Sequence, residues 1–416
     1  MNFVKQYRCT LCDAIYKFEP TTLTCLSCGE KGILDIEYDY EMMKKVVNKS
    51  YFEKCEDYSI WRYKPMMSIH HGFINDTLHV GWTPLYHSLN LSETVNIKSL
   101  YIKDDSANPT ASLKDRASVV AVVKALEHKQ TIIACSSTGN AASSLAGHAA
   151  KVGLKSVIFV PSRAPIGKLT QLSLFGADVY KVDGDYKLAY ALSKDAIKHF
   201  GWYNRNAAVN PHLVEGKKTV ALEIAEQLEF NLTDWVVVSV GDGCTIAGVY
   251  KGFYDLYKLD MINKIPKLLG VQSEGCAPFY HAFKNDEPMK ESEENTIADS
   301  IAVGIPRNPI KGMNAVVKSN GAFITVSDAE IIESMKVLAS FEGIFSEPAA
   351  AASFAGLKNA INQNIIKSYE TATIIITGSG LKDIQNAQKA MTSIPIIKAN
   401  LTTFIETYSL GGKKDD

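Results

Sequence analysis

The stretch NPTASLKDRAS, residues 108–118, places a lysine where a loop turns into a helix. Asn108 and Pro109 are typical of a loop, and apolar residues recur at helical spacing from Asp115 onward. Because a helix begins with a positive partial charge, an ammonium group there is unfavourable and its pKa falls. Lys114 is therefore either an ordinary solvated lysine or an amine held unprotonated, which can act as a nucleophile and a base.

The same stretch predicts how this helix begins. Thr110 or Ser112 could accept a hydrogen bond from the first free N–H groups, and Asp115 stands three residues after Ser112, as in a capping box. Asp115 and the following Arg116 are accordingly expected to make contacts at the helix terminus. A direct catalytic role for these two residues is the alternative.

A second polar segment, SSTGN at residues 136–140, follows the apolar run TIIACS. Its hydroxyl groups, its side-chain amide and the N–H groups of the helix that follows are suited to binding a carboxylate or another anion. An ordinary polar turn between a strand and a helix is the alternative.

A third segment, VVVSVGDGCTIAG, combines a buried run with a glycine turn at residues 241–245. Glycines let backbone N–H groups approach an anion closely, and the start of the following helix favours phosphate. A dinucleotide-binding turn would need a third glycine where Ile246 stands, so a single phosphate fits better. Because a phosphate would repel Asp242, that side chain is expected to point outward.

A fourth segment, IIITGSGLKD, ends an apolar run with Thr377, whose hydroxyl could donate or accept one hydrogen bond at a ring nitrogen. A lysine at a helix start, a phosphate-binding turn and two polar turns together suit a phosphorylated aldehyde held as a Schiff base. Pyridoxal 5'-phosphate (PLP) fits this description. The helix terminus and an enclosed pocket would both keep the Lys114 amine unprotonated, as imine formation requires.

These segments belong to a chain in which strand and helix patterns alternate from about residue 100. Each of seven β-branched runs is followed by a turn rich in Gly, Ser or Asn and by an amphipathic stretch: SLYIKD, TIIACSS, SVIFVP, ADVYKVD, WVVVSVGDG, KLLGVQSE and TATIIITGSG. Such alternation predicts a doubly wound, mostly parallel α/β sheet. Because ligands bind at the carboxyl ends of parallel strands, the turns are expected to meet there.

Over roughly residues 75–400 the chain resembles the fold-type II PLP enzymes, and within them the threonine synthase family. Seven motifs occur in the family's order: VGWTPLY, NPTASLKDRAS, SSTGN, NPHLVEGKKTVALEI, VGDGCTIAGVYKGF, SEPAAAAS and TGSGLKD. The resemblance implies a fold of two doubly wound α/β domains.

The resemblance also implies residue roles. Lys114 would form the Schiff base with the cofactor and then take the Cα proton of the substrate. Asn140 would contact the cofactor's phenolic oxygen, and Thr377 would lie at its pyridine nitrogen. The cofactor's phosphate would be held by Gly241, Asp242, Gly243, Cys244 and Thr245. The substrate's carboxylate would be held by Ser136, Ser137 and Thr138.

One segment departs from the family, in which Asn-Ser-x-Asn-Pro-x-Arg-Leu-Glu-Gly is common. The chain reads AAVNPHLVEG, so Ala207, Ala208 and Leu213 stand where relatives place groups that bind the substrate's phosphate. Leucine in place of a guanidinium removes a bidentate phosphate partner. Three other basic residues could bind phosphate instead: Arg205, Lys217 and Arg163.

Two activities of a PLP-dependent carbon–oxygen lyase are therefore open. The first is the threonine synthase reaction, in which O-phosphohomoserine and water give threonine and phosphate. The alternative is a related enzyme with a different substrate, such as a serine or threonine dehydratase, or a cysteate synthase-like enzyme that replaces the phosphate of phosphoserine.

The N-terminus carries two CxxC pairs, Cys9 with Cys12 and Cys25 with Cys28. Four thiolates at this spacing predict a structural, zinc-ribbon-like Zn site, and Gly29 would ease the turn after the second pair. The alternatives are two chance pairs, a site that has lost its metal, a redox role, or a nucleic-acid-binding module.

The bulk composition favours a cytoplasmic protein, and the resemblance implies a small amino-acid substrate. The 416 residues have a net charge of −1, so no general attraction to nucleic acid or an anionic membrane is expected. Cysteines occupy the place where a signal peptide would have its apolar core. Residues 130–150 lack Lys, Arg, Asp and Glu, but their Ser, Thr, Asn and Gly content is too polar for a membrane span.

The expected layout has five parts, and a homodimer is expected by analogy with the family. The parts are a zinc-ribbon-like element with four cysteines (1–40), a helical connector (41–80), a large PLP-binding α/β domain (81–110 and 205–400), a small mobile α/β domain (111–204) and a tail (401–416).

Overall fold

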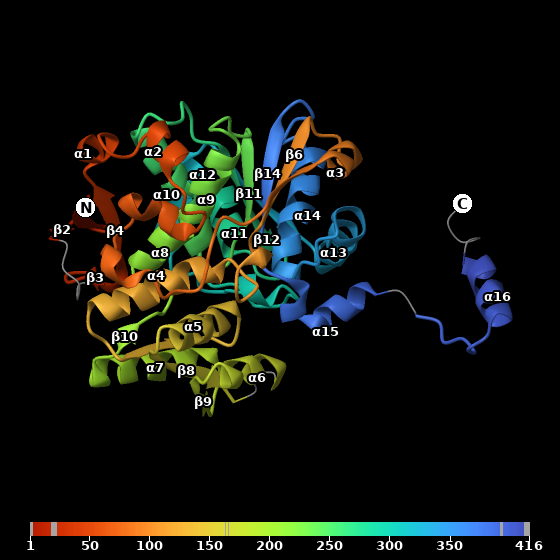
Figure 1. Ribbon diagram of the computed structural model, residues 1–416, viewed down its shortest axis with the longest axis horizontal. Helices are drawn as coiled ribbons and strands as arrows, with labels where there is room; N and C mark the ends of the chain where they lie inside the picture. Colours follow the sequence, from red (N-terminus) through yellow and green to blue (C-terminus); the bar gives the residue numbers. More distant parts are fainter. Residues whose placement is uncertain (1–2, 18–22, 163, 165, 392–393, 412–416) are drawn as a thin grey trace.

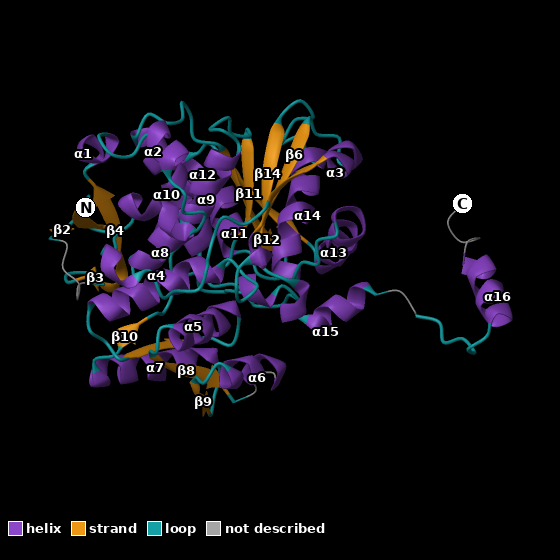
Figure 2. Ribbon diagram, in the orientation of Figure 1, coloured by secondary structure: helices purple, strands orange, loops and turns teal. Residues whose placement is uncertain are grey.

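A large, mostly parallel β-sheet, a smaller parallel sheet and one small antiparallel sheet organise the chain in the computed structural model (Figures 1 and 2). The structure describes residues 3–17, 23–162, 164, 166–391 and 394–411. Among these residues, no helix is both long and apolar enough to cross a membrane.

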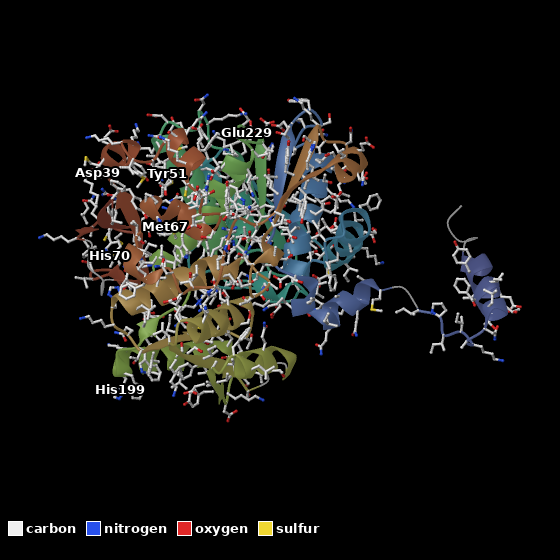
Figure 3. The ribbon with its side chains drawn as sticks, in the orientation of Figure 1. Asp39, Tyr51, Met67, His70, His199 and Glu229 are labelled. Carbon is white, nitrogen blue, oxygen red and sulfur yellow. The ribbon has the colours of Figure 1, made fainter. Side chains whose placement is uncertain are left out.

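The N-terminal sheet is antiparallel, with the strand order β2-β1-β4-β3. Its strands are β1 (Val4–Cys9), β2 (Ile15–Tyr16), β3 (Thr24–Cys25) and β4 (Gly29–Tyr38). Short helices follow: α1 (Tyr40–Lys44), α2 (Lys49–Lys54), η1 (Ile60–Met66) and η2 (His71–Phe73). Met67, which follows η1 and is labelled in Figure 3, is fully buried, so this segment packs tightly on the body of the protein.

The large sheet has the strand order β13-β12-β11-β14-β6-β5, and all its neighbours are parallel except β5 and β6. The strands are β5 (Leu85–Ser88), β6 (Ser99–Asp104), β11 (Trp235–Ser239), β12 (Lys267–Ser273), β13 (Ala322–Val326) and β14 (Thr371–Ile376). Helices cover both of its faces, which is why its central strands read as continuous apolar runs (Figure 2).

Alternate residues of the central strand β11 enter different cores. Val236 and Val238 pack with α9 (Thr219–Gln227), α10 (Cys244–Lys258) and α12 (Pro309–Lys318). Val237 packs on the opposite face, with α3 (Leu89–Thr94), α13 (Asp328–Glu342) and α14 (Pro348–Asn362). This is the period of two expected of a strand buried on both faces.

The smaller sheet is parallel, with the strand order β10-β7-β8-β9. Its strands are β7 (Ile132–Ser136), β8 (Lys155–Pro161), β9 (Asp178–Val182) and β10 (Tyr203–Asn204). The associated helices are α4 (Lys114–Glu127), α5 (Asn140–Lys151), α6 (Ile166–Leu174), α7 (Tyr186–Phe200) and α8 (His212–Lys217).

The remaining elements lie in the loops and near the C-terminus. They are η3 (Asp105–Ala107), α11 (Pro278–Asn285), η4 (Asp299–Ile301), η5 (Gly380–Lys382), α15 (Ile384–Ala387), η6 (Gln388–Ala390) and α16 (Leu401–Gly411). Figure 1 shows α16 apart from the body of the protein, beyond α15.

The predicted doubly wound α/β architecture is confirmed. All seven runs that predict strands form strands, namely β6, β7, β8, β9, β11, β12 and β14. Three further strands, β5, β10 and β13, are not among the predicted ones. Each lies at the edge of its sheet. β5 and β10 are short and partly solvated, as edge strands can be, and carry no long apolar run, whereas β13 reads AFITV and is mostly buried.

Candidate active site

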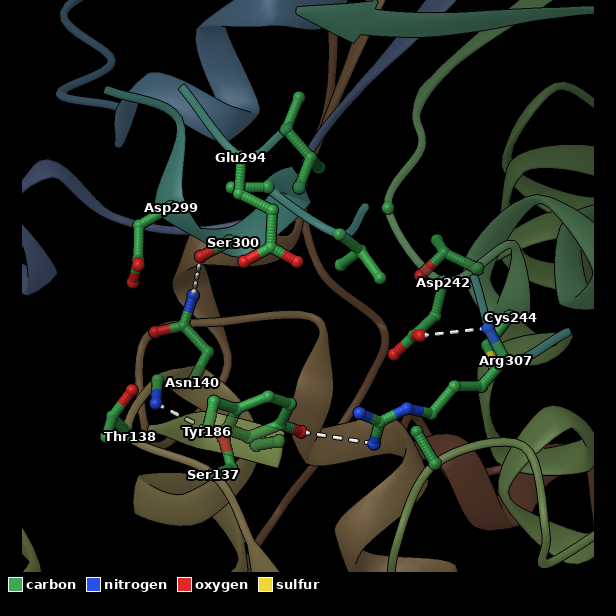
Figure 4. Close-up of a pocket in the computed structure, with 18 of the residues that line it drawn as sticks. Ser137, Thr138, Asn140, Tyr186, Asp242, Cys244, Glu294, Asp299, Ser300 and Arg307 are labelled. Carbon is green, nitrogen blue, oxygen red and sulfur yellow. Dashed lines mark hydrogen bonds between the residues drawn. The ribbon is translucent and has the colours of Figure 1, made fainter. Parts of the chain in front are cut away.

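The segments singled out in the sequence open onto one cavity of about 730 Å³, which lies beyond the carboxyl ends of strands from both parallel sheets (Figure 4). The cavity is lined by Lys114, residues 136–140, residues 241–245 and Thr377, among others. Its volume is within the range of roughly 300–1,000 Å³ that is common for small-molecule sites. Every residue assigned to the cofactor or to the substrate's carboxylate therefore lines this one cavity.

Lys114 is the first residue of α4, and its side chain lines the cavity. Its amine has no hydrogen-bond or ion-pair partner among the described residues. Burial lowers the pKa of this amine, and the carboxylates of Glu347 and Asp242 oppose that change only in part. The structure thus places an amine with a lowered pKa where the sequence predicts a nucleophile.

The predicted capping box at the start of α4 is wrong. Leu113 is the N-cap residue, and no side chain caps this helix. The Asp115 carboxylate instead accepts hydrogen bonds from the Thr110 backbone N at 2.6 Å and from Ser144 Oγ at 2.6 Å. The start of α4 is held by the backbone, because Leu113 N donates to the Thr377 carbonyl oxygen at 2.9 Å. This bond fixes Lys114 beside the end of β14.

Arg116 also differs from the prediction, since it points away from the helix terminus into a fully buried ion network. Its Nε lies 2.7 Å from Asp105 Oδ2, and its Nη1 lies 2.5 Å from Glu223 Oε1. Lys103 Nζ lies 2.7 Å from Glu223 Oε2. The network ties the first turn of α4 to β6, to η3 and to α9.

The glycine turn at residues 241–245 has the shape of a phosphate cradle. A Cβ at Gly243, where φ is +83°, would lie 2.7 Å from the Asn308 carbonyl oxygen, and a Cβ at Gly241 would lie 3.0 Å from Ile301 Cα. Only glycine fits without a shift at Gly243, and the turn leads into the first residue of α10. The Asp242 carboxylate accepts a hydrogen bond from Arg307 N at 3.2 Å, so it is bound to a neighbouring loop (Figure 4).

The SSTGN turn ends in Asn140, the first residue of α5. The Asn140 amide donates to both carboxylate oxygens of Glu347, at 2.9 Å each. Burial raises the pKa of Glu347, although Asn140 and Lys114 act in the opposite direction. Sequence reasoning assigned no role to Glu347. Its only signal was its place in the family motif SEPAAAAS.

Arg307 is a second residue of the cavity that sequence reasoning missed. Its Nη1 donates to the Tyr186 hydroxyl at 3.3 Å, and its guanidinium carbon lies 3.8 Å from the centre of the Tyr190 ring. These contacts join the loop before α12 to α7, and therefore join the two parallel sheets across the cavity (Figure 4). No motif marks this residue in the sequence.

The four N-terminal cysteines converge at one point. The sulfur atoms of Cys9, Cys12, Cys25 and Cys28 all lie within 4.8 Å of one another. Ligands about 2.3 Å from a tetrahedral zinc ion lie about 3.8 Å apart, and Cys12 Sγ lies 3.7 Å from Cys25 Sγ. Gly29 has a φ of +60°, as the predicted tight turn needs.

The cysteine-bearing sheet packs against α8, one wall of the active-site region. Tyr7 Oη lies 3.2 Å from His212 Nε2, and the Tyr38 hydroxyl donates to the Glu215 carboxylate. Ile33 of this sheet packs with Ala208 and Cys244, next to the glycine turn. A change in the cysteine cluster would therefore reach the cavity through direct contacts.

Residues 77–378 match the family of pyridoxal-phosphate dependent enzymes. The threonine synthase of Methanosarcina acetivorans is 37% identical to the chain over 402 residues, which are 96% of this chain and 97% of that protein. The threonine synthase of Methanocaldococcus jannaschii is 39% identical over 388 residues, which cover 92% and 94% of the two chains.

Solved structures show the same fold at lower identity. A pyridoxal 5'-phosphate-dependent aspartate racemase has a TM-score of 0.64 and 23% identity, covering 74% of this chain and 92% of that one. Threonine deaminase isoform 2 from Solanum lycopersicum has a TM-score of 0.65 and 21% identity, covering 74% and 87%. The predicted fold, that of the fold-type II PLP enzymes, is confirmed.

Proposed function

The chain belongs to the threonine synthase family of PLP-dependent lyases, and from this premise we propose that it converts O-phosphohomoserine and water to threonine and phosphate. The observation that carries the proposal is the Lys114 amine, which lines the same cavity as the glycine turn, in a chain that aligns with threonine synthases over nearly their full length.

The residues present fit PLP. The glycine turn at residues 241–245 offers backbone N–H groups at the start of α10, where a Cβ on Gly243 would collide. Lys114, Asn140 and Thr377 line the same cavity. We assign the phosphate to the turn, the aldehyde to Lys114, the phenolic oxygen to Asn140 and the ring nitrogen to Thr377.

When bound, PLP supplies an electron sink for the pair left at Cα. The hydroxyl and N–H groups of residues 136–138 bind the substrate's carboxylate at the start of α5 and so orient its Cα–H bond. Lys114 Nζ removes the Cα proton, which a buried amine with a lowered pKa can do near neutral pH. The same amine then carries protons at Cβ and Cγ while phosphate leaves Cγ and water adds at Cβ.

A substrate panel tests this function. Phosphohomoserine, phosphoserine, serine and threonine are supplied separately to the PLP-loaded enzyme, and phosphate, 2-oxo acid and threonine are quantified. We expect equal amounts of phosphate and threonine from phosphohomoserine alone. Phosphate without threonine, or 2-oxo acid from an unphosphorylated substrate, would contradict the proposal and favour the alternative of a dehydratase or β-replacement enzyme.

We also propose that the four N-terminal cysteines bind one structural zinc ion. A four-thiolate site is closed to substrate, so zinc would act on stability. Because the cysteine sheet contacts α8 and the glycine turn, Cys25→Ser should release the metal, lower the melting temperature and weaken PLP binding. Metal analysis with thermal unfolding measures this. Cys276→Ser, at a buried cysteine outside the cluster, is the control. A native protein in which metal analysis finds no zinc would refute this proposal.

A cytoplasmic homodimer with a mobile small domain completes the proposal. All eight cysteines are free, which suits a reducing compartment.

Helix α16 exposes Leu401, Phe404, Ile405 and Tyr408, which share one face at helical spacing. A second chain could cover that face. Light scattering should give twice the chain mass, and truncation after Met391 should shift the mass toward the monomer. A native monomer would rule out the homodimer.

A further inference from the structure

Resting on the proposed function, we propose that Arg205 and Lys217 form the binding site for the phosphate group of the substrate, separate from the glycine turn that holds the phosphate of PLP. Both residues line the cavity, and both side chains are almost completely buried. The third basic residue that the sequence left open, Arg163, lies outside the described residues.

Arg205 has no ionic partner among the described residues. Within the part of the chain that the structure describes, its guanidinium donates only to Ser118 Oγ, at 3.0 Å from Nη2 and 3.3 Å from Nε. Burial lowers the pKa of this group, and nearby acidic groups, Asp115 among them, oppose that change only in part. A buried cation of this kind is costly unless an anion joins it. Its remaining N–H groups can serve a ligand in the cavity.

Lys217 is only 4% exposed to solvent, and unlike Arg205 it makes no side-chain hydrogen bond to a described residue. Its amine has neither a hydrogen bond nor an ion pair with any residue that the structure describes. Burial lowers the pKa of Lys217 to about 8, and nearby Lys114 and Arg205 act in the same direction. The ordinary structural role of a buried lysine, an ion pair, is therefore absent at this position.

The backbone brings these cations to the cavity by close helix contacts. A Cβ at Gly216 would lie 2.1 Å from the Arg116 carbonyl oxygen, so α8 touches the backbone of α4. A Cβ at Gly248 would lie 2.9 Å from Lys217 Cβ, so α8 also touches α10. Lys217 is thus the last residue of a short helix that packs against the N-terminal halves of both α4 and α10, and the N-terminal ends of these helices favour anions.

The charges of the proposed ligands match this arrangement. The cofactor brings one phosphate, which the glycine turn holds, and the substrate brings a carboxylate, which the SSTGN turn holds. A phosphorylated substrate brings a second phosphate. Arg205 and Lys217 are buried cations that line the cavity and have no role in holding the cofactor's phosphate or the substrate's carboxylate. A guanidinium and an ammonium group commonly bind a phosphate dianion together.

The departures from the family pattern agree with this assignment. The Leu213 side chain is buried in the core beside the small sheet and is not among the residues that line the cavity. Lys217 stands four residues later, one turn along α8, and does line it. Ala207 lines the cavity with a short side chain, which leaves room for a ligand. The chain has a cation one turn away from the place where relatives carry theirs.

The test measures binding of inorganic phosphate to the PLP-loaded enzyme by equilibrium dialysis at constant ionic strength. PLP fills the glycine turn, so phosphate must bind elsewhere. We expect Lys217→Met and Arg205→Met to weaken phosphate binding by roughly 10- to 100-fold, the worth of one charged hydrogen-bonded contact. Lys217→Arg should retain most of it. Lys318→Met, at an exposed lysine of α12, is the control and should bind phosphate as the native enzyme does.

Two further readouts separate this role from a structural one. Lys217→Met removes an unpaired buried charge, so the melting temperature of the ligand-free protein should rise or stay unchanged, whereas loss of a structural residue would lower it. In turnover, KM for the phosphorylated substrate should rise far more than kcat falls.

Unchanged phosphate binding in both variants would overturn the inference. An equal loss of phosphate and PLP affinity would also overturn it, because the cations would then serve the phosphate of the cofactor. Failure of the proposed function is distinguishable. If the enzyme makes no threonine but binds phosphate through Arg205 and Lys217, the phosphate site is supported and only the proposed threonine synthase activity is wrong.

Discussion

Lys114→Ala should lower turnover by roughly 10³-fold or more, while the protein stays folded. The substitution removes the amine that lines the cavity at the start of α4. In the proposed reaction this one group both attaches the cofactor and moves the substrate's protons, so no other side chain replaces it. Because the amine has no ionic partner among the described residues, its loss should not lower the melting temperature.

Borohydride reduction gives a readout that is independent of activity. The native enzyme with PLP should carry one covalent label per chain, on the peptide that contains Lys114, and the variant should carry none. Lys151→Ala, at an exposed lysine of α5, makes the same chemical change away from the cavity and should leave both label and turnover intact. Native turnover in Lys114→Ala, or a label on another lysine, would refute the assignment.

The parts of the fold that the sequence predicted are those in which local pattern and burial coincide. A central strand such as β11 is apolar on both faces, so the run WVVVS predicts a strand even when the neighbouring strands are unknown. The edge strands β5 and β10 carry no such run, whereas β13, also at an edge, reads AFITV and was missed although its pattern is apolar. The turns of the site could also be predicted from local sequence, because glycine and hydroxyl residues that directly follow a strand usually form a turn or bind a ligand.

The residues that sequence reasoning missed act through distant partners. Glu347 meets Asn140 across 207 positions, and Arg307 meets Tyr186 across 121. Neither pair has a spacing that a motif could reveal. The capping box failed because Asp115 lies five residues after Thr110 and bends back to that loop, a contact that competes with helix capping. The prediction for Arg116 failed for a similar reason, because one of its two carboxylate partners, Glu223, is brought to it only by the tertiary fold.

Arg116→Met should lower the free energy of unfolding by about 3–5 kcal/mol, the usual cost of leaving buried carboxylates without their cation. Arg116, Asp105, Glu223 and Lys103 are all fully buried, and Lys103 alone cannot neutralise two carboxylates. Since Arg116 fixes the first turn of α4, cofactor binding through Lys114 should weaken as well. Chemical unfolding measures the loss. Arg8→Met, in the solvent-exposed pair with Glu37, is the control and should change the free energy of unfolding far less.

The pH dependence of stability gives the same network a second signature. Burial disfavours the ionised form of Glu223, but Arg116 and Lys103 outweigh it and lower the pKa of this carboxyl from 4.5 to about 2. A lowered carboxyl pKa adds stability above pH 4.5, and that stability is lost as the pH falls toward 2. In Arg116→Met the carboxylate is less favoured, so the loss of stability over this interval should be smaller than in the native protein. Equal acid sensitivity of the two proteins, together with an unchanged free energy of unfolding at about pH 7, would show that Arg116 does not hold the start of α4 through these carboxylates.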